Sequence, residues 1–109
     1  MKWIYLIIAI ITEVIATSAL KESQGFSKII PSIVVITGYS LTFYFMSLTL
    51  KEMSVGITYA IWSGMGILLI SLIGYFRYNQ VLDSAAILGM SFIAMGIIIL
   101  RFFSKSIEV

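Results

Sequence analysis

The side chain with the clearest chemical potential is Glu13, an acidic residue inside the apolar segment 3–20. The segment contains no Lys, Arg or His, and Lys2 and Lys21 mark its two ends. At about 1.5 Å of rise per helical residue, Glu13 lies roughly 12 to 16 Å from these ends, near the midplane of a hydrocarbon layer of about 30 Å. A lone carboxylate at that depth is costly unless it is protonated or paired, so we interpret Glu13 as a functional residue. The alternative is a residue that only hydrogen-bonds a neighbouring helix.

Small side chains share the helical face of Glu13. Ala9, Ala16 and Thr17 lie three or four residues from it, which is the spacing of neighbours on one face of a helix. These residues leave space beside the carboxylate. We therefore expect a binding site for a proton or a substrate on this face.

Aromatic side chains recur at helical spacing in the next two apolar segments. Tyr39 and Phe43 lie four residues apart, and Tyr59 and Trp62 lie three apart. Aromatic rings near an anionic group suit a hydrophobic cation, because the ring quadrupole attracts positive charge. The alternative is packing, which is favoured for Phe43, or a place at the membrane interface for Tyr59 and Trp62.

Four long apolar segments must position these residues. Of the 109 residues, 61% are hydrophobic and 11% are charged, and the mean hydropathy is +1.10. Soluble domains carry about 25% charged residues. Each segment is close to the roughly 20 residues that a spanning helix needs, and the segments are 3–20, 31–50, 56–76 and 84–103. The sequence predicts an all-α membrane protein with one domain, residues 1–109.

The connections between the segments are short and carry helix-end signals. Gly25 is expected to cap the first helix, and Pro31 suits the first turn of the second. Asp83 or Ser84 is expected to be the N-cap of the fourth.

Glycines inside the third and fourth segments suggest two further roles. Gly64 and Gly66 are almost adjacent, and glycine pairs are recognised sites of helix kinks. Gly89 and Gly96 lie seven residues apart near Ile93, a spacing that suits helix packing and a dimer interface.

The sequence lacks the residues that several classes of function require. There is no cysteine, no histidine and no glycine-rich phosphate loop, and no cluster of metal ligands or nucleophile–base pair is present. The basic residues are too few and scattered for nucleic-acid binding. We therefore predict a protein that is not an enzyme and has no cofactor. An ion gradient, most naturally of protons, would drive any transport, because burial favours the protonated form of a carboxylate.

The basic residues are almost evenly divided between the two sides of the membrane. With four spans, one side carries Lys2, Lys51, Arg101 and Lys105, and the other carries Lys21, Lys28 and Arg77. A four-to-three division gives the positive-inside rule little to act on. Either one orientation prevails by a small margin or the chain inserts in both orientations.

Two stretches of the chain form distinctive motifs. They are the run Thr12–Thr17 with Leu20–Lys21, Gly25–Ser27 and Pro31–Ser32, and the run Gly56–Gly66. Together they resemble the small multidrug resistance family. The resemblance covers nearly the whole chain and implies a multi-pass protein of the bacterial cell membrane. It implies an antiparallel homodimer of four-helix chains that exports hydrophobic organic cations in exchange for protons.

The resemblance also implies roles for individual residues. Glu13 would bind the proton or the substrate, Tyr59 and Trp62 would line the site, and Gly64 and Gly66 would allow a kink. The fourth segment would supply dimer contacts. Guanidinium exporters of this family typically carry Trp three residues after the glutamate, where this chain has Ala16. Export of quaternary ammonium compounds and aromatic dyes is therefore expected. The alternatives are a guanidinium exporter, a channel, and a structural or regulatory membrane subunit.

Overall fold

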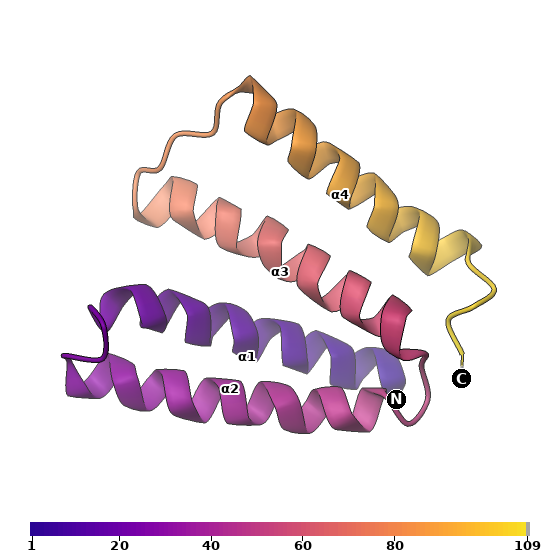
Figure 1. The fold of residues 1–109 in the computed structure, drawn as a ribbon, viewed down its shortest axis with the longest axis horizontal. Coiled ribbons are helices and arrows are strands. Elements are labelled where there is room, and N and C mark those ends of the chain that lie inside the picture. Colours follow the sequence, from indigo (N-terminus) through magenta and orange to yellow (C-terminus); the bar gives the residue numbers. More distant parts are fainter. Residues whose placement is uncertain (109) are drawn as a thin grey trace. The chain divides into compact units, whose positions relative to one another are not determined.

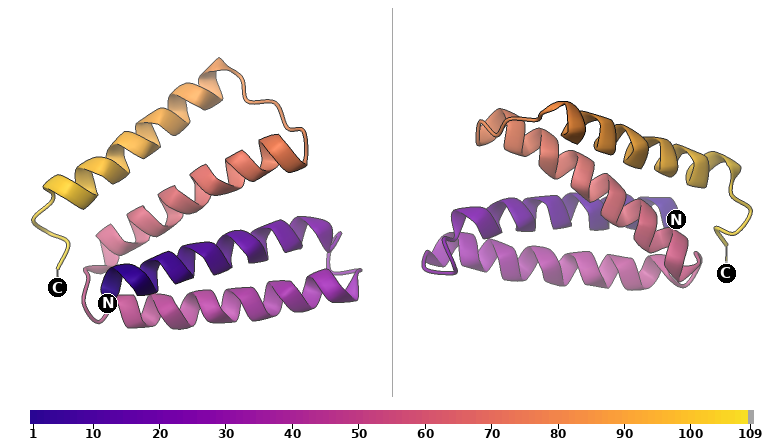
Figure 2. Two further views of the ribbon diagram at one scale, coloured as in Figure 1. Left: turned by 180° about the vertical axis from the view of Figure 1, so that it is seen from behind. Right: turned by 45° about the horizontal axis from the view of Figure 1, so that its top comes forward.

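The computed structural model describes residues 1–108 and contains four helices in this range (Figure 1). They are α1 (Lys2–Glu22), α2 (Ile29–Thr49), α3 (Val55–Arg77) and α4 (Ser84–Phe103). The chain divides into two compact units, which are the α1–α2 hairpin (Met1–Glu52) and the α3–α4 hairpin from Met53 onward. Figure 2 shows each hairpin from two further directions. The predicted all-α fold with four membrane helices is confirmed, and the single domain 1–109 stays a prediction.

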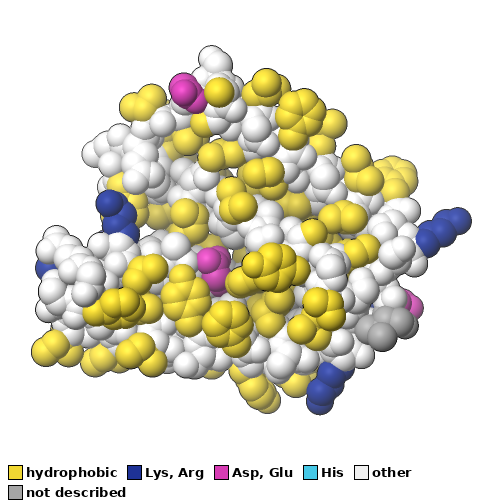
Figure 3. Space-filling view, viewed as in Figure 1, with side chains coloured by type: hydrophobic (Ala, Val, Ile, Leu, Met, Phe, Trp, Pro, Cys, Tyr) yellow, Lys and Arg dark blue, Asp and Glu magenta, His cyan; other side chains and the backbone are white. Residues whose placement is uncertain are grey.

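All four helices are long and apolar enough to cross a membrane. They contain 21, 21, 23 and 20 residues, which corresponds to about 30 Å or more of helix. The mean hydropathy of their most apolar windows is 2.0, 1.7, 1.8 and 2.2 in chain order. Hydrophobic side chains are spread widely over the face seen in Figure 3, and Lys and Arg lie mainly at its margins. The predicted segments match these helices to within about two residues at each end.

The turn between α1 and α2 differs from the prediction that Gly25 caps α1. The C-cap is Ser23, which keeps a right-handed helical backbone, and its Oγ donates to the carbonyl of Leu20 (2.7 Å) and accepts from the N–H of Phe26 (3.1 Å). Gly25 has a φ of +73°, in the left-handed region that glycine adopts without strain. Because the Ser23 hydroxyl satisfies the end of the helix, Gly25 serves the reversal of the chain two residues later.

The α1–α2 hairpin is held by a close approach of the two backbones. A Cβ atom added to Gly38 would lie 2.8 Å from the Cβ of Ala16 and 3.3 Å from the carbonyl oxygen of Thr12. On the same side of α2, the hydroxyls of Thr12 and Thr42 are hydrogen-bonded at 2.8 Å, and Thr42 is fully buried. Small residues thus bring the helices together, and a hydrogen-bonded pair of hydroxyls adds to their contact.

The α3–α4 hairpin packs around Gly64. A Cβ atom added there would lie 2.9 Å from Cδ1 of Ile97 and 3.3 Å from Cγ2 of Ile93, so α4 uses the missing side chain to approach α3. At the other end, the carbonyl of Gly74 accepts the N–H groups of Tyr78 (3.2 Å) and Gln80 (3.0 Å). These two bonds close the end of α3.

The start of α4 has the predicted N-cap. The carboxylate of Asp83 accepts the N–H of Ala86 at 2.8 Å. Pro31 lies in the first turn of α2, also as predicted. At both positions the residue type satisfies or tolerates the unpaired N–H groups at a helix start.

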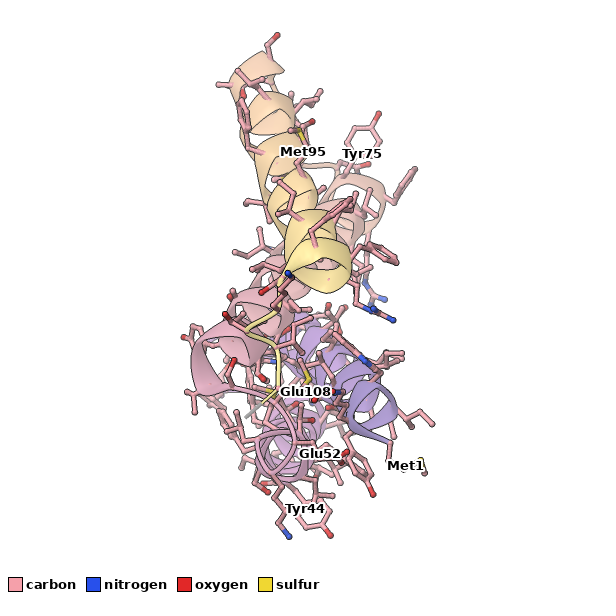
Figure 4. The ribbon with its side chains drawn as sticks, turned by 90° about the vertical axis from the view of Figure 1, so that its right-hand side faces the viewer. Met1, Tyr44, Glu52, Tyr75, Met95 and Glu108 are labelled. Atoms are coloured by element: carbon pink, nitrogen blue, oxygen red, sulfur yellow. The ribbon has the colours of Figure 1, made fainter. Side chains whose placement is uncertain are left out.

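The C-terminal segment folds back along the start of α3, which the sequence analysis did not predict. The N–H of Ser54 donates to the carbonyl of Ile107 (2.7 Å), and its Oγ donates to the carbonyl of Ser106 (2.8 Å). An antiparallel bridge also joins Met53 to Glu108, which is labelled in Figure 4. These bonds tie the end of the α3–α4 hairpin to its beginning.

The contact at Gly38 predicts a specific effect of adding one methyl group. Gly38→Ala should destabilise the protein by about 1–3 kcal/mol, because the new methyl group overlaps the Cβ of Ala16. Thermal unfolding in detergent measures the effect. The control is Gly56→Ala on α3, where no atom lies within 4 Å of the added Cβ.

A compensating change makes this test sharper. The double variant Ala16→Gly/Gly38→Ala moves the methyl group to the other helix and should recover most of the lost stability. A Gly38→Ala protein as stable as the Gly56→Ala control contradicts the packing described here.

Candidate functional site

Glu13 lies in the middle of α1 and its two carboxylate oxygens have different surroundings. Oε1 accepts a hydrogen bond of 2.8 Å from the hydroxyl of Thr17, one helical turn along α1. Oε2 is buried and has no hydrogen-bond partner within the described residues. One oxygen therefore has a hydrogen-bond donor, and the other has none among the described residues.

The hydroxyl of Thr17 connects this carboxylate to α2. It lies 2.6 Å from the phenolic oxygen of Tyr39, a half-buried side chain. The helix approach at Gly38 places Tyr39 here, since the two residues are adjacent on α2. Glu13, Thr17 and Tyr39 thus form one hydrogen-bonded group within the α1–α2 unit, and all three were named as site candidates from the sequence.

A second aromatic ring extends the surface that begins with Tyr39. The rings of Tyr39 and Phe43 are stacked on α2, with centroids 6.4 Å apart and an angle of 22° between their planes. Phe43 is 60% exposed in the chain. An aromatic surface therefore begins beside the Thr17 hydroxyl and runs one turn along α2. Its contact with a substrate stays a prediction.

The alanines near Glu13 are fully buried. Ala9 and Ala16 have no exposed surface. The room beside Ala16 is occupied by α2 at Gly38, so this small residue serves the approach of the two helices. Contact of Ala9 or Ala16 with a substrate stays a prediction.

The aromatic pair of α3 forms a second group, within the α3–α4 unit. The rings of Tyr59 and Trp62 meet edge to face, with centroids 5.3 Å apart and an angle of 66° between them. Tyr59 is 61% exposed, and the indole N–H of Trp62 is buried without a hydrogen-bond partner among the described residues. The pair presents ring faces and one unused donor. That the rings of Tyr59 and Trp62 share one binding site with Glu13 is a proposal.

The glycines singled out from the sequence lie in continuous helices. Gly64 and Gly66 are both buried within α3, and the helix is unbroken across them, so a hinge there stays a prediction. On α4, Ile93 packs against Gly64, whereas added Cβ atoms at Gly89 and Gly96 would meet nothing within 4 Å. The predicted dimer contacts at these three residues are likewise untested by a single chain.

Two residues of the contact between α1 and α2 were missed by the sequence analysis. They are Gly38 and Thr42, which lie four residues apart on the face of α2 that packs against α1. This is a small-xxx-small spacing, the pattern that permits close helix contacts in membranes. The spacing of Gly38 and Thr42 was the sequence signal that could have identified this helix contact. Among the described residues, no group of three or more possible metal ligands occurs.

Comparisons with known proteins agree with this architecture. The model of the family described as Small Multidrug Resistance protein matches residues 1–93. The chain is 50% identical over 104 residues to the quaternary ammonium compound-resistance protein QacE of Escherichia coli, covering 95% of this chain and 94% of the relative. A Salmonella typhimurium relative whose name refers to ethidium bromide resistance is 50% identical over 99 residues, which is 91% of this chain and 86% of the relative.

A third relative extends the comparison to a protein named as a transporter. The multidrug transporter PA4990 of Pseudomonas aeruginosa is 46% identical over 105 residues, covering 96% of each chain. Four spanning helices and bacterial relatives of this kind make the chain a multi-pass protein of the bacterial inner membrane. The resemblance inferred from the sequence is confirmed, and the chain belongs to the small multidrug resistance family.

Proposed function

We propose that this protein is a proton-coupled antiporter that exports hydrophobic organic cations across the inner membrane. The observation that carries the proposal is the carboxylate of Glu13, buried in the middle of a spanning helix with Oε2 unpartnered among the described residues. In an apolar layer such an oxygen is stabilised by a proton or by a positively charged ligand. Names of relatives that refer to quaternary ammonium compounds, ethidium and multiple drugs support a cationic substrate.

Competition at one carboxylate provides the coupling in this proposal. When a proton occupies Glu13, the negative charge that holds the cation is gone, and when the cation is bound the proton must leave. Inward proton flow therefore displaces substrate outward. Glu13 is the one acidic residue within the four apolar segments, so a dimer would bring two such carboxylates to one cavity.

The aromatic side chains define the proposed substrate class. Tyr39 with Phe43, and Tyr59 with Trp62, present rings within the two hairpins. Quaternary ammonium compounds and planar dyes bind such rings by cation–π and dispersion contacts. Ala16 packs closely against Gly38, so a large planar side chain would not fit at position 16 of α1. The site is therefore not narrowed by such a side chain.

We also propose that the working unit is an antiparallel homodimer. No described residue of α4 is buried, although this helix has the highest hydropathy of the four. A second copy packed against α4, near Gly89, Ile93 and Gly96, would cover such a surface. Opposite insertion of the two copies would let them exchange conformations to open the site on either side, with Gly64 and Gly66 as the flexible point of α3.

The exchange mechanism predicts the effect of neutralising Glu13. Glu13→Gln should abolish uptake driven by a pH gradient in membrane vesicles, because an amide neither releases a proton nor attracts the cation. Glu13→Asp keeps the charge and should retain binding with an altered pH dependence. The matched control is Glu52→Gln, at an exposed acidic residue in the loop between α2 and α3, which should behave like the unaltered protein. Coupled uptake at a normal rate by Glu13→Gln would disprove the mechanism.

The aromatic site predicts an order of substrates. In proteoliposomes, ethidium and quaternary ammonium ions should exchange with protons much faster than guanidinium does. Trp62→Ala should slow ethidium more than tetrapropylammonium, since only the dye stacks on the indole. Tyr44→Ala provides a control, because Tyr44 is 58% exposed and points away from α1 (Figure 4). Rapid guanidinium exchange without quaternary ammonium transport would instead identify a guanidinium exporter.

The dimer proposal predicts that both orientations occur in one membrane. Ser23, between α1 and α2, is fully buried and hydrogen-bonded, so the exposed Ser27 is the better position for a reporter cysteine on that side. Ser106 is exposed and serves the other side. Single cysteines at Ser27 and Ser106 should each react with an impermeant maleimide from both faces of the membrane. One-sided labelling of an active transporter would refute dual insertion.

A further inference from the structure

The hydroxyl of Thr17 lies between the carboxylate of Glu13 on α1 and the phenol of Tyr39 on α2, two groups that the proposed function uses. It is 2.8 Å from Oε1 of Glu13 on its own helix and 2.6 Å from the phenolic oxygen of Tyr39 on α2. Oε1 thus has its partner, whereas Oε2 of Glu13 has none among the described residues. Thr17 therefore determines which oxygen of the carboxylate is left without a hydrogen-bond partner.

Proton counting gives the chain of hydroxyls a direction. Thr17 has one hydroxyl proton, and it is donated to Oε1 of Glu13. The bond between Thr17 and Tyr39 then requires Tyr39 to be the donor. Two donors in series point toward the carboxylate, and such a chain strengthens each of its bonds.

We propose that Thr17 is a positioning residue that links Tyr39 to Glu13 and sets how strongly the carboxylate prefers a substrate cation to a proton. Its hydroxyl holds Oε1, leaves Oε2 as the oxygen without a partner, and stabilises the ionised carboxylate that receives the cation. The same bond fixes the ring of Tyr39, and with it the stacked ring of Phe43, beside the charge. This inference rests on the proposed proton–cation competition at Glu13.

Within the α1–α2 unit, Tyr39 is the titratable side chain of α2 that faces Glu13. Tyr44, the other titratable residue of that helix, points away from α1 (Figure 4). The remaining titratable residues of α1 lie toward its two ends, and they are Lys2, Tyr5, Lys21 and Glu22. The link from α2 to the carboxylate therefore passes through Tyr39 and Thr17.

The hairpin contains a matched control for a merely structural role. Thr12 and Thr42 also join α1 to α2 through their hydroxyls, at 2.8 Å, and Thr42 also donates to the carbonyl of Gly38. This pair makes no hydrogen bond to Glu13. Thr42→Val and Thr17→Val each remove one hydroxyl between the same two helices at constant side-chain shape, and only the second removes a donor from the carboxylate.

The experiment measures the binding of tetrapropylammonium to the purified full-length protein by calorimetry over a series of pH values. With Thr17→Val, protons should compete about ten-fold more effectively, which moves the binding curve by about one pH unit toward higher pH. Thr17→Ser restores the hydroxyl and should restore the curve. Thr42→Val should leave the curve in place, whatever it does to thermal stability.

Tyr39→Phe removes the hydrogen bond between Tyr39 and Thr17. It also tests the proposal if the Thr17→Val protein does not fold. It should move the curve in the same direction by a smaller amount, and Thr17→Val/Tyr39→Phe should move it no further than Thr17→Val alone. An unmoved curve for Thr17→Val, an equal shift for Thr42→Val, or an unmoved curve for Tyr39→Phe overturns the proposal.

The same data separate this proposal from the one on which it rests. If tetrapropylammonium binding to the unaltered protein does not depend on pH, proton–cation competition itself is wrong. If that dependence is present, disappears in Glu13→Gln and is unchanged in Thr17→Val, the competition stands and Thr17 only packs between the helices.

Discussion

The cost of holding a carboxylate in hydrocarbon is the constraint on which the rest of this structure depends. The apolar segment 3–20 around Glu13 contains no basic residue, and only Oε1 of Glu13 receives a hydrogen bond within the described chain. An acidic residue at mid-membrane costs about 3 kcal/mol on insertion scales. Within the α1–α2 hairpin the compensation is the hydroxyl of Thr17 with Tyr39 behind it, and in the proposed function a bound proton or cation supplies the rest.

The positions of those compensations follow from the packing of two helices. The contact between Gly38 and Ala16 brings α1 and α2 close enough for the hydroxyls of Thr17 and Tyr39 to meet. Thr12 and Thr42 add a second pair of hydroxyls to the contact between the two helices. A larger side chain at Gly38 would move Tyr39 away from Thr17. The hydrogen bonds at Glu13 and Thr17 consequently depend on Gly38, whose only part in them is to let the helices come close.

The limits of sequence-based prediction here follow from the same physics. Hydropathy located the four helices because each spanning segment must satisfy its own backbone in lipid, and Glu13 stood out because it violates the apolar pattern. Helical spacing placed Thr17 beside Glu13 but left its bond to Tyr39 unseen, since the register between two helices depends on side chains from both. The fold-back of Ser106 and Ile107 onto Ser54 was also missed, because main-chain carbonyls supply its acceptors.

The two hairpins differ in how many side chains their helices bury. The α1–α2 hairpin buries side chains on both helices and joins them by two hydroxyl pairs. In the α3–α4 hairpin, α4 buries none of its described residues, and Gly89 and Gly96 leave open backbone on it. A helix that approaches its neighbour at Gly64 and leaves its other glycines uncovered is suited to receive a second helix. The proposed second copy would meet that need and would bring the second carboxylate that coupled exchange uses.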